Sequence, residues 1–113
     1  MIVETTDARF QEDVLAAPGL TLLDLRGTSD GPSRAQGPVL ARFAAAHPEV
    51  RVVKLDTEKH AGFAAHLGVR AVPTLLVFKD GFALAGAVGV QHDYAIGRLL
   101  RDAERRAEAI PQA

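Results

Sequence analysis

"LLDLRGTSDGPSRAQGPVL", residues 22–40, places an apolar run, a polar loop and a helix in direct succession. The leucines continue almost without interruption over 20–26, which predicts a strand that is buried on both faces. Asp24 is the one acidic residue in that run. A polar loop over 27–31 leads into a helix that we expect to reach Ala46, with Pro38 kinking it. Small polar residues therefore gather at a helix N-terminus.

Further strands and helices are predicted on both sides of this stretch. Apolar residues at helical spacing, short β-rich runs and an Asp-Gly turn at 80–81 mark them. In chain order we expect a strand at 2–4, a helix after a cap at Thr6 or Asp7, the strand and helix above, a strand at 50–56, a helix at 58–67, a hairpin of 74–78 and 82–88, and a helix at 93–109. The predicted class is α/β, in the order βαβαβαββα, with a mixed sheet of four to five strands flanked by about four helices.

Composition restricts the class of protein. The 113 residues are few enough for one domain, 1–113, in which we expect 107–113 to be a frayed tail. The net charge is −1, and acidic and basic residues are interspersed along the chain, so we expect neither a nucleic-acid nor a membrane partner. The N-terminus does not read as a signal peptide, which favours the cytoplasm.

Cysteine is absent from the chain. Its absence excludes structural disulfides, thiolate metal sites and a thiol nucleophile within the chain. The four histidines are scattered over predicted helices and loops, so no metal site is indicated, and we expect no cofactor.

Several fragments, in the right order, resemble the thioredoxin family over residues 3–103. The stretch at 22–40 stands where thioredoxins have a strand with an aspartate, then Trp-Cys-Gly-Pro-Cys-Lys, then a helix with a proline. Residues 52–81, "VVKLDTEKHAGFAAHLGVRAVPTLLVFKDG", resemble the family's second half. "AVPT" occupies the family's cis-proline loop, and Gly89 matches the glycine after the last strand. The resemblance implies the thioredoxin fold.

The departures from the family pattern lie where its chemistry takes place. Ser29, Asp30 and Ser33 stand where the motif has Trp, Cys and Cys. Dithiol exchange needs a thiolate of lowered pKa and a second, resolving thiol. We therefore expect a redox-inactive member with Asp-Gly-Pro-Ser in place of Cys-Gly-Pro-Cys.

On this reasoning we expect a protein that is not an enzyme. It would be a non-catalytic thioredoxin-like module that binds proteins, as a chaperone-like or scaffolding unit, through the former active-site face. Two alternatives stay open. One is a self-associating structural subunit that pairs through 82–88. The other is an enzyme with non-thiol or glutathione-dependent chemistry on the same fold.

The degenerate active-site loop supplies the first group of candidate site residues. A side chain here can simply cap the helix, with Ser29 or Asp30 accepting from backbone N–H groups. The same loop can also present Asp30 to a partner. The candidates are Ser29, Asp30, Gly31, Pro32 and Ser33.

Asp24 and Lys54 are a second candidate group. By resemblance, Asp24 is the aspartate that handles protons for the second cysteine, and Lys54 is its neighbouring lysine. A buried acid is costly unless it is paired or protonated. We expect a vestigial pair of Asp24 with Lys54, with Arg26 as a further cation.

Val72, Pro73, Gly89 and Val90 are the candidate partner-binding residues. The resemblance implies a cis peptide bond before Pro73, and implies that Val72 pairs with the extended backbone of a partner. Such pairing uses main-chain groups and needs no sulfur. We expect a protein or peptide partner at this face, and a homodimer is a further option.

Overall fold

The computed structural model describes residues 2–28 and 30–111 of the chain. Its elements follow the predicted order, with helical turns and strands close to the predicted bounds. They are β1 (Ile2–Glu4), η1 (Gln11–Leu15), β2 (Leu20–Arg26), α1 (Gly31–Ala46), β3 (Arg51–Asp56), α2 (Ala61–His66), β4 (Thr74–Lys79), β5 (Phe82–Val88) and α3 (Asp93–Glu108).

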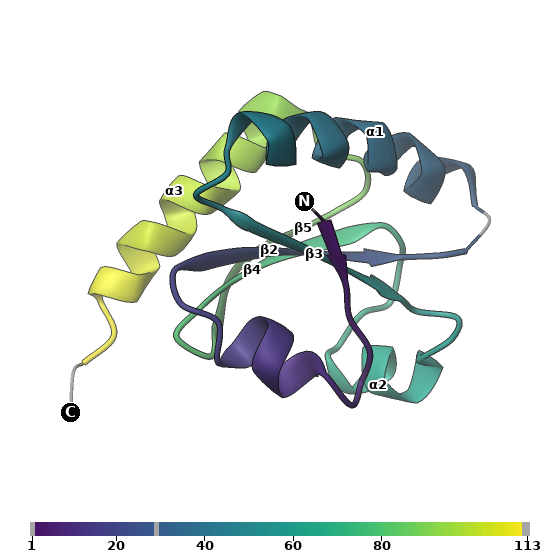
Figure 1. Cartoon of the computed structure of the whole chain (residues 1–113), viewed down its shortest axis with the longest axis horizontal. Coiled ribbons are helices and arrows are strands. Elements are labelled where there is room, and N and C mark those ends of the chain that lie inside the picture. The colour runs from purple at the N-terminus through teal and green to yellow at the C-terminus, as the bar shows by residue number, and fades with distance from the viewer. Residues whose placement is uncertain (1, 29, 112–113) are drawn as a thin grey trace.

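The strands form one mixed sheet with β2 at its centre. The strand order is β1-β3-β2-β4-β5. β1, β3 and β2 are parallel, whereas β4 runs antiparallel to β2 and to β5. Figure 1 shows α1 and α3 on one side of the sheet, and α2 with the purple turn of η1 on the other. The predicted α/β class and the mixed sheet flanked by helices are confirmed.

The sheet separates two apolar cores, and the alternation of side chains along β2 supplies both. Leu22 packs with Val39, Phe43 and Leu100 from α1 and α3. Leu23 and Leu25 belong to the opposite core, which is closed by η1 and by residues of α2 and its C-terminal turn. Since Asp24 has the same parity as Leu22, its carboxylate lies on the α1 side of the sheet.

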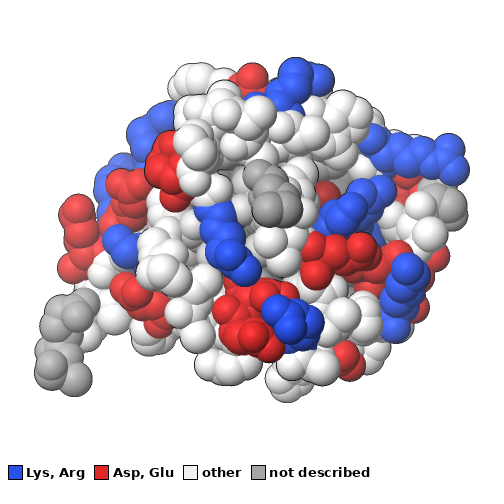
Figure 2. Space-filling model, in the orientation of Figure 1, with Lys and Arg blue, Asp and Glu red and all other residues white. Residues whose placement is uncertain are grey.

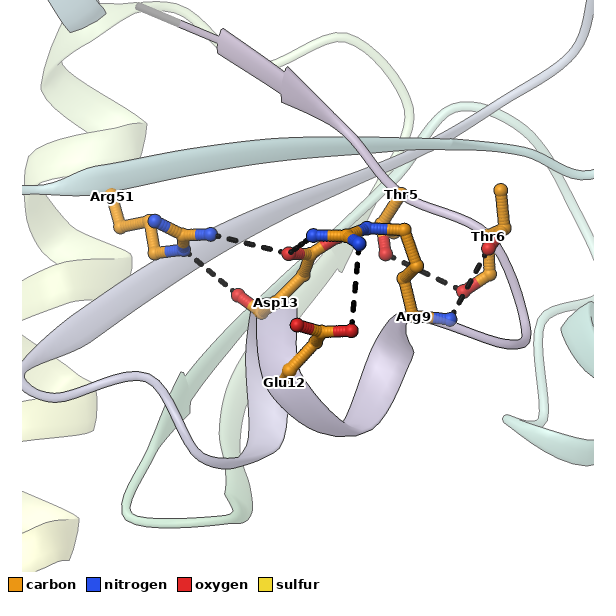
Figure 3. A network of polar contacts seen from close by, with 6 residues as sticks. All are labelled: Thr5, Thr6, Arg9, Glu12, Asp13 and Arg51. Atoms are coloured by element: carbon orange, nitrogen blue, oxygen red, sulfur yellow. Dashed lines mark hydrogen bonds and ion pairs between the residues drawn. The ribbon is translucent and has the colours of Figure 1, made fainter.

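The predicted first helix is a π-helix, η1, in which Ala16 N–H donates to Gln11 O at 2.8 Å. An ion-pair network fixes this segment to the sheet (Figure 3). Asp13, only 3% exposed, accepts from Arg9 Nη2 at 3.3 Å. Arg51, at the start of β3, lies 3.5 Å from the same carboxylate through Nη2 and donates from Nε to Asp13 O at 2.8 Å. The network therefore ties η1 to β3.

The pKa of Asp13 reflects two opposed influences. Burial raises it, but hydrogen bonds from Thr5 and Arg9 and the charges of Arg9 and Arg51 outweigh burial. The net result is a pKa below the usual value of a carboxyl group, so Asp13 is ionised at neutral pH.

The free edge of β5 carries no charged side chain between Phe82 and Val88, and both end residues are more than half exposed. The register against β4 shifts between Val77 and Phe78, so that Leu84 has no paired residue. Arg106 of α3 donates from Nη1 to Leu84 O at 2.6 Å. A bulge and an arginine from α3 thus occupy the middle of this edge.

The second helix starts later than predicted. Asp56 Oδ1 accepts from Glu58 N and Lys59 N at 2.9 and 3.2 Å, which closes a turn rather than a helix. His60 then has non-helical backbone angles, and α2 begins at Ala61. The predicted start at residue 58 was wrong because the Asp56 cap serves this preceding turn.

Acidic and basic side chains alternate over the face drawn in Figure 2, without a large field of one sign. Among the helices in 2–28 and 30–111, none has the length and apolar character that crossing a membrane requires. The cytoplasmic location stays a prediction.

Candidate functional site

Asp30 caps the N-terminus of α1. Its backbone is extended, and its Oδ2 accepts from Ser33 N–H at 3.0 Å. Pro32 lies in the first turn, where a missing N–H costs nothing. The hydrogen bonds that Asp30 receives from Ser33 lower the pKa of its carboxyl group, so this cap carries a negative charge at neutral pH. Ser29, the first residue of the predicted loop, lies outside the described residues.

Ser33 is fully buried and closes the loop from inside. Its Oγ accepts from Gly27 N–H at 3.0 Å. A Cβ on Gly27 would lie 2.2 Å from Asp30 Oδ1 and 3.3 Å from Val72 Cγ2. The carboxylate of Asp30 and the side chain of Val72 therefore pack against the same glycine, which brings the two predicted loops together.

Asp24 lies beneath the first turns of α1 and is 2% exposed. Lys54 is its register partner on β3, and among the described residues no ion pair joins the two side chains. Burial raises the pKa of Asp24 to about 6, against the opposing charges of Arg26 and Lys54, while Asp30 adds to the rise. Asp24 can therefore exchange a proton near neutral pH.

The Val72–Pro73 peptide bond is cis, as the resemblance implied. Thr74 Oγ1 donates to Ala71 O at 2.7 Å, and Gly89 N–H donates to Pro73 O at 2.8 Å. These bonds hold the proline loop beside Gly89, whose φ of +91° is a conformation that favours glycine. Val72 is half-buried, and within the described part of the chain its N–H and C=O have no hydrogen-bond partner.

Gln36 was missed by sequence reasoning. It is 0% exposed, although it belongs to the first half of α1. Its Nε2 donates to Gln91 O at 2.8 Å, and its Oε1 accepts from Gln91 N–H at 2.7 Å. This reciprocal pair ties the segment after β5 to α1. The burial of Gln36 could have been predicted from its spacing, because it lies three residues after Ser33 and on the same helix face as Val39 and Phe43.

The structure thus brings most of the predicted residues to one surface, at the end of the sheet where β2 runs into α1. We call it the loop face, and define it by residues 27–28, 30–33, 71–73 and 89–90. Asp24 and Lys54 lie behind it. Among the described residues, no three histidines or carboxylates are arranged to hold a metal ion.

Comparisons with known proteins identify the family. The thioredoxin family model matches residues 1–102. This chain belongs to the thioredoxin family. It is 39% identical over 89 residues to a thioredoxin of Pseudomonas aeruginosa, covering 78% of this chain and 82% of that protein. It is 37% identical over 87 residues to a thioredoxin of Rhodospirillum rubrum, covering 76% and 84%. It is 36% identical over 85 residues to thioredoxin 1 of Synechococcus elongatus, covering 74% and 79%.

These relatives contradict two expectations, the non-catalytic binding module and the chain that is not an enzyme. They carry the name thioredoxin, and thioredoxins are oxidoreductases. Both expectations rested on the absence of cysteine from the whole chain, whereas the similarity to the relatives extends over three quarters of it. The chain belongs to the thioredoxin family although it lacks cysteine. The comparisons give no support for a scaffold role.

Proposed function

We propose that this thioredoxin-family chain binds an extended polypeptide segment at the loop face, through the main chain of Val72. The observation that carries the proposal is the half-buried Val72, whose N–H and C=O have no hydrogen-bond partner among residues 2–28 and 30–111. An extended segment can satisfy both groups by adding a short strand, as in other cases of β-strand addition.

The neighbourhood of Val72 supports this geometry. Gly27 has no side chain, so the loop before α1 approaches Val72 closely. Gly89 is fixed to Pro73, and Gln36 holds the segment that follows Val90. The walls on both sides of Val72 are therefore fixed by hydrogen bonds, and this reduces the ordering cost of binding.

Charge at the loop face differs from that of a thiol site. Asp30 is held as a carboxylate at the helix N-terminus, with Oδ2 bonded to Ser33 N–H. We propose that Asp30 adds to recognition as well as capping the helix. The caps formed by Asp and Asn are about equal in strength, so Asp30→Asn separates the two roles.

Sulfur chemistry at this face depends on the bound molecules. The chain contains no cysteine, so each sulfur atom of a thiol–disulfide exchange at the loop face has to belong to a bound segment or to an external thiol. The residues of the chain can hold the segment, and Asp24 can accept or return a proton behind it.

A thiol-free probe tests the recognition step by itself. We suggest S-carboxymethylated insulin B chain, titrated by isothermal calorimetry and by backbone amide NMR. We expect shifts at residues 71–73 and 89–90. Val72→Asp, which adds a charge beside the unpartnered main chain, should weaken binding about tenfold or more, as for a central residue of an interface. Asp30→Asn should weaken binding measurably without loss of stability.

Phe82→Asp is the matched control, because Phe82 is 51% exposed at the opposite end of β5 from Gly89. It should leave the affinity within about twofold of the wild-type value, as expected outside the contact region. Equal losses in Val72→Asp and Phe82→Asp, or no loss in Val72→Asp, would refute the proposal. Urea unfolding of each variant shows whether the fold is kept.

A further inference from the structure

A cavity of about 790 Å³ opens at the end of the sheet opposite the loop face. It is lined by Leu20 at the start of β2, by Val50 just before β3 and by Lys79 at the end of β4. The second half of α1 and the middle of α3 form its walls. Its volume is in the range of small-molecule sites, about 300–1,000 Å³. No residue of the loop face lines it, so it is independent of the proposed function.

The inner surface of the cavity is formed by apolar and aromatic side chains. Phe43 and Leu100, 5% and 8% exposed, reach it from the core between α1, α3 and the sheet. The imidazole of His47 stacks on the Phe43 ring with centroids 4.3 Å apart. Together these side chains offer a partly aromatic surface on which an apolar group can lie.

Gly97 keeps the α3 wall of the cavity open. A glycine inside a helix costs about 1 kcal/mol relative to alanine. Neither backbone angles nor a close backbone approach requires it here. A Cβ at this position would meet only Arg101 Nη1, at 3.2 Å, which is the mobile end of a long side chain. What the missing side chain provides is space beside Leu100, together with room for the Arg101 guanidinium.

Basic groups without a partner surround the opening. Arg42, Lys79 and Arg101 come from α1, β4 and α3. Among the described residues, none of these three side chains forms an ion pair or hydrogen bond.

Three acidic groups also lie at the rim, and one of them has a side-chain partner among the described residues. Glu49 lies 3.4 Å from His47 Nδ1. Asp93 is the first residue of α3, where the helix dipole favours a negative charge. Glu104 is the third acidic residue. The formal charges of the rim are therefore balanced, three positive and three negative, and an anion is favoured where the three basic side chains form no ion pair or hydrogen bond with the described residues.

We propose that this cavity binds an amphipathic carboxylate, an aliphatic or aromatic acid whose apolar body lies on Phe43 and Leu100. Its carboxylate is held at the rim by Arg42 and Arg101. Guanidinium groups match carboxylates with two parallel hydrogen bonds, and the apolar surface below them contributes by removing the ligand's carbon atoms from water.

Three probes of equal chain length separate the contributions of charge and apolar surface. They are decanoate, 1-decanol and decylamine, each titrated below its aggregation concentration into the full chain by backbone amide NMR. Decanoate should shift the amides of Leu20, Phe43, Gly97 and Leu100 with one dissociation constant. Its affinity should exceed that of decylamine by about tenfold or more, the effect of one charge-assisted hydrogen bond.

Variants then assign the site. Gly97→Leu should abolish decanoate binding by filling the cavity, and Gly97→Ala, which improves helix propensity, should weaken it while raising the unfolding midpoint. Arg42→Gln combined with Arg101→Gln should weaken decanoate about tenfold and leave decanol unchanged. Arg98→Gln is the matched control, because Arg98 is an exposed arginine of α3 that does not line the cavity.

The proposal is overturned by any of three results. Decylamine could bind as tightly as decanoate, the decanoate shifts could spread over surfaces outside the cavity, or Arg98→Gln could weaken decanoate as much as the paired substitution does. If Gly97→Leu does not fold, Gly97→Ala provides the test of the ligand's position. An unchanged decanoate affinity in Gly97→Ala would contradict that position.

Discussion

Gln36 and Gln91 exchange two hydrogen bonds, 2.8 and 2.7 Å long, between a buried side chain of α1 and the main chain after β5. The pairing joins residues that are 55 positions apart in the chain. It fixes one wall of the loop face to the helix that carries Asp30 at its N-terminus.

Gln36→Leu removes both bonds and keeps a similar volume. It leaves the N–H and C=O of Gln91 without their partner, so the free energy of unfolding should fall by about 1–3 kcal/mol in urea titrations. Gln91→Ala is the comparison, because it keeps both main-chain bonds of the pair and loses only the side-chain bonds from Gln91 Nε2 to Val88 O and Gly89 O, at 3.3 and 3.1 Å. A larger loss in Gln91→Ala than in Gln36→Leu would contradict the assignment of the clamp to Gln36.

Asp24→Asn tests the raised pKa of about 6. Between pH 3.8 and 6 the native state binds a proton that the unfolded state has lost, so wild-type stability should fall as the pH rises through this window. The total fall is about 3 kcal/mol, from about two pKa units at 1.36 kcal/mol each. Asp24→Asn should remove this dependence and be more stable than the wild type at pH 7. The control Asp80→Asn, in the β4–β5 turn, should keep this dependence of stability on pH. If stability changed with pH equally in the wild type and in Asp24→Asn, Asp24 would not be the titrating group.

Asp13 gives a pH dependence of the opposite sign. Its pKa is below the ordinary 3.8, so its contribution is present above that value and is lost as the pH falls through the native pKa. Asp13→Asn should lower the free energy of unfolding by about 2 kcal/mol at pH 7, because Arg51 loses a buried ionic partner. The difference from the wild type should shrink below pH 4. The control Glu12→Gln, which neutralises an exposed acid of the same turn, should change the free energy of unfolding little. If the difference between Asp13→Asn and the wild type stayed constant down to pH 2, the ionised pair would not be the cause of that difference.

Gly27→Ala tests how closely the two loops approach. The new methyl group would lie 2.2 Å from Asp30 Oδ1, so it should displace the capping carboxylate and cost about 1–3 kcal/mol, as overpacking does. In an Asp30→Ala background the obstructing oxygen is gone, and the same change should cost less. The double-mutant cycle, measured in urea, gives the coupling. Additive effects would mean that the loop moves without strain. Gly31→Ala is the control, since a Cβ there meets no atom of the described residues within 4 Å.

Much of the fold could be predicted because periodicity decided it locally. The leucines of β2, the Asp-Gly turn and the apolar stripe of α3 each determine an element without help from distant residues. The π-helix at Gln11–Leu15 could not be predicted in this way, since Asp13 O accepts from Arg51, a residue 38 positions away. Tertiary contacts decided that turn.

The candidate site was predictable in its composition and less so in its contacts. The resemblance to the thioredoxin family brought Asp30, Val72 and Gly89 into consideration. It did not reveal that Ser33 is turned inward to Gly27, or that Gln36 serves as a clamp. Hydrogen bonds of this kind depend on side-chain direction and burial, which the identity of a residue does not specify. The cavity at Phe43 depends on the meeting of three strand ends with two helices, and no local stretch of sequence contains that information.

The bulge at Leu84 and its bond to Arg106 bear on how the chain behaves when it is concentrated. An uncharged strand at the margin of a sheet is a template on which other chains can assemble into fibrils. Here one guanidinium occupies a carbonyl that such growth would use, and the irregular spacing at Leu84 prevents a stacked strand from matching the whole length of β5. The protection of this edge against strand pairing therefore depends on a contact between α3 and β5, outside the loop face.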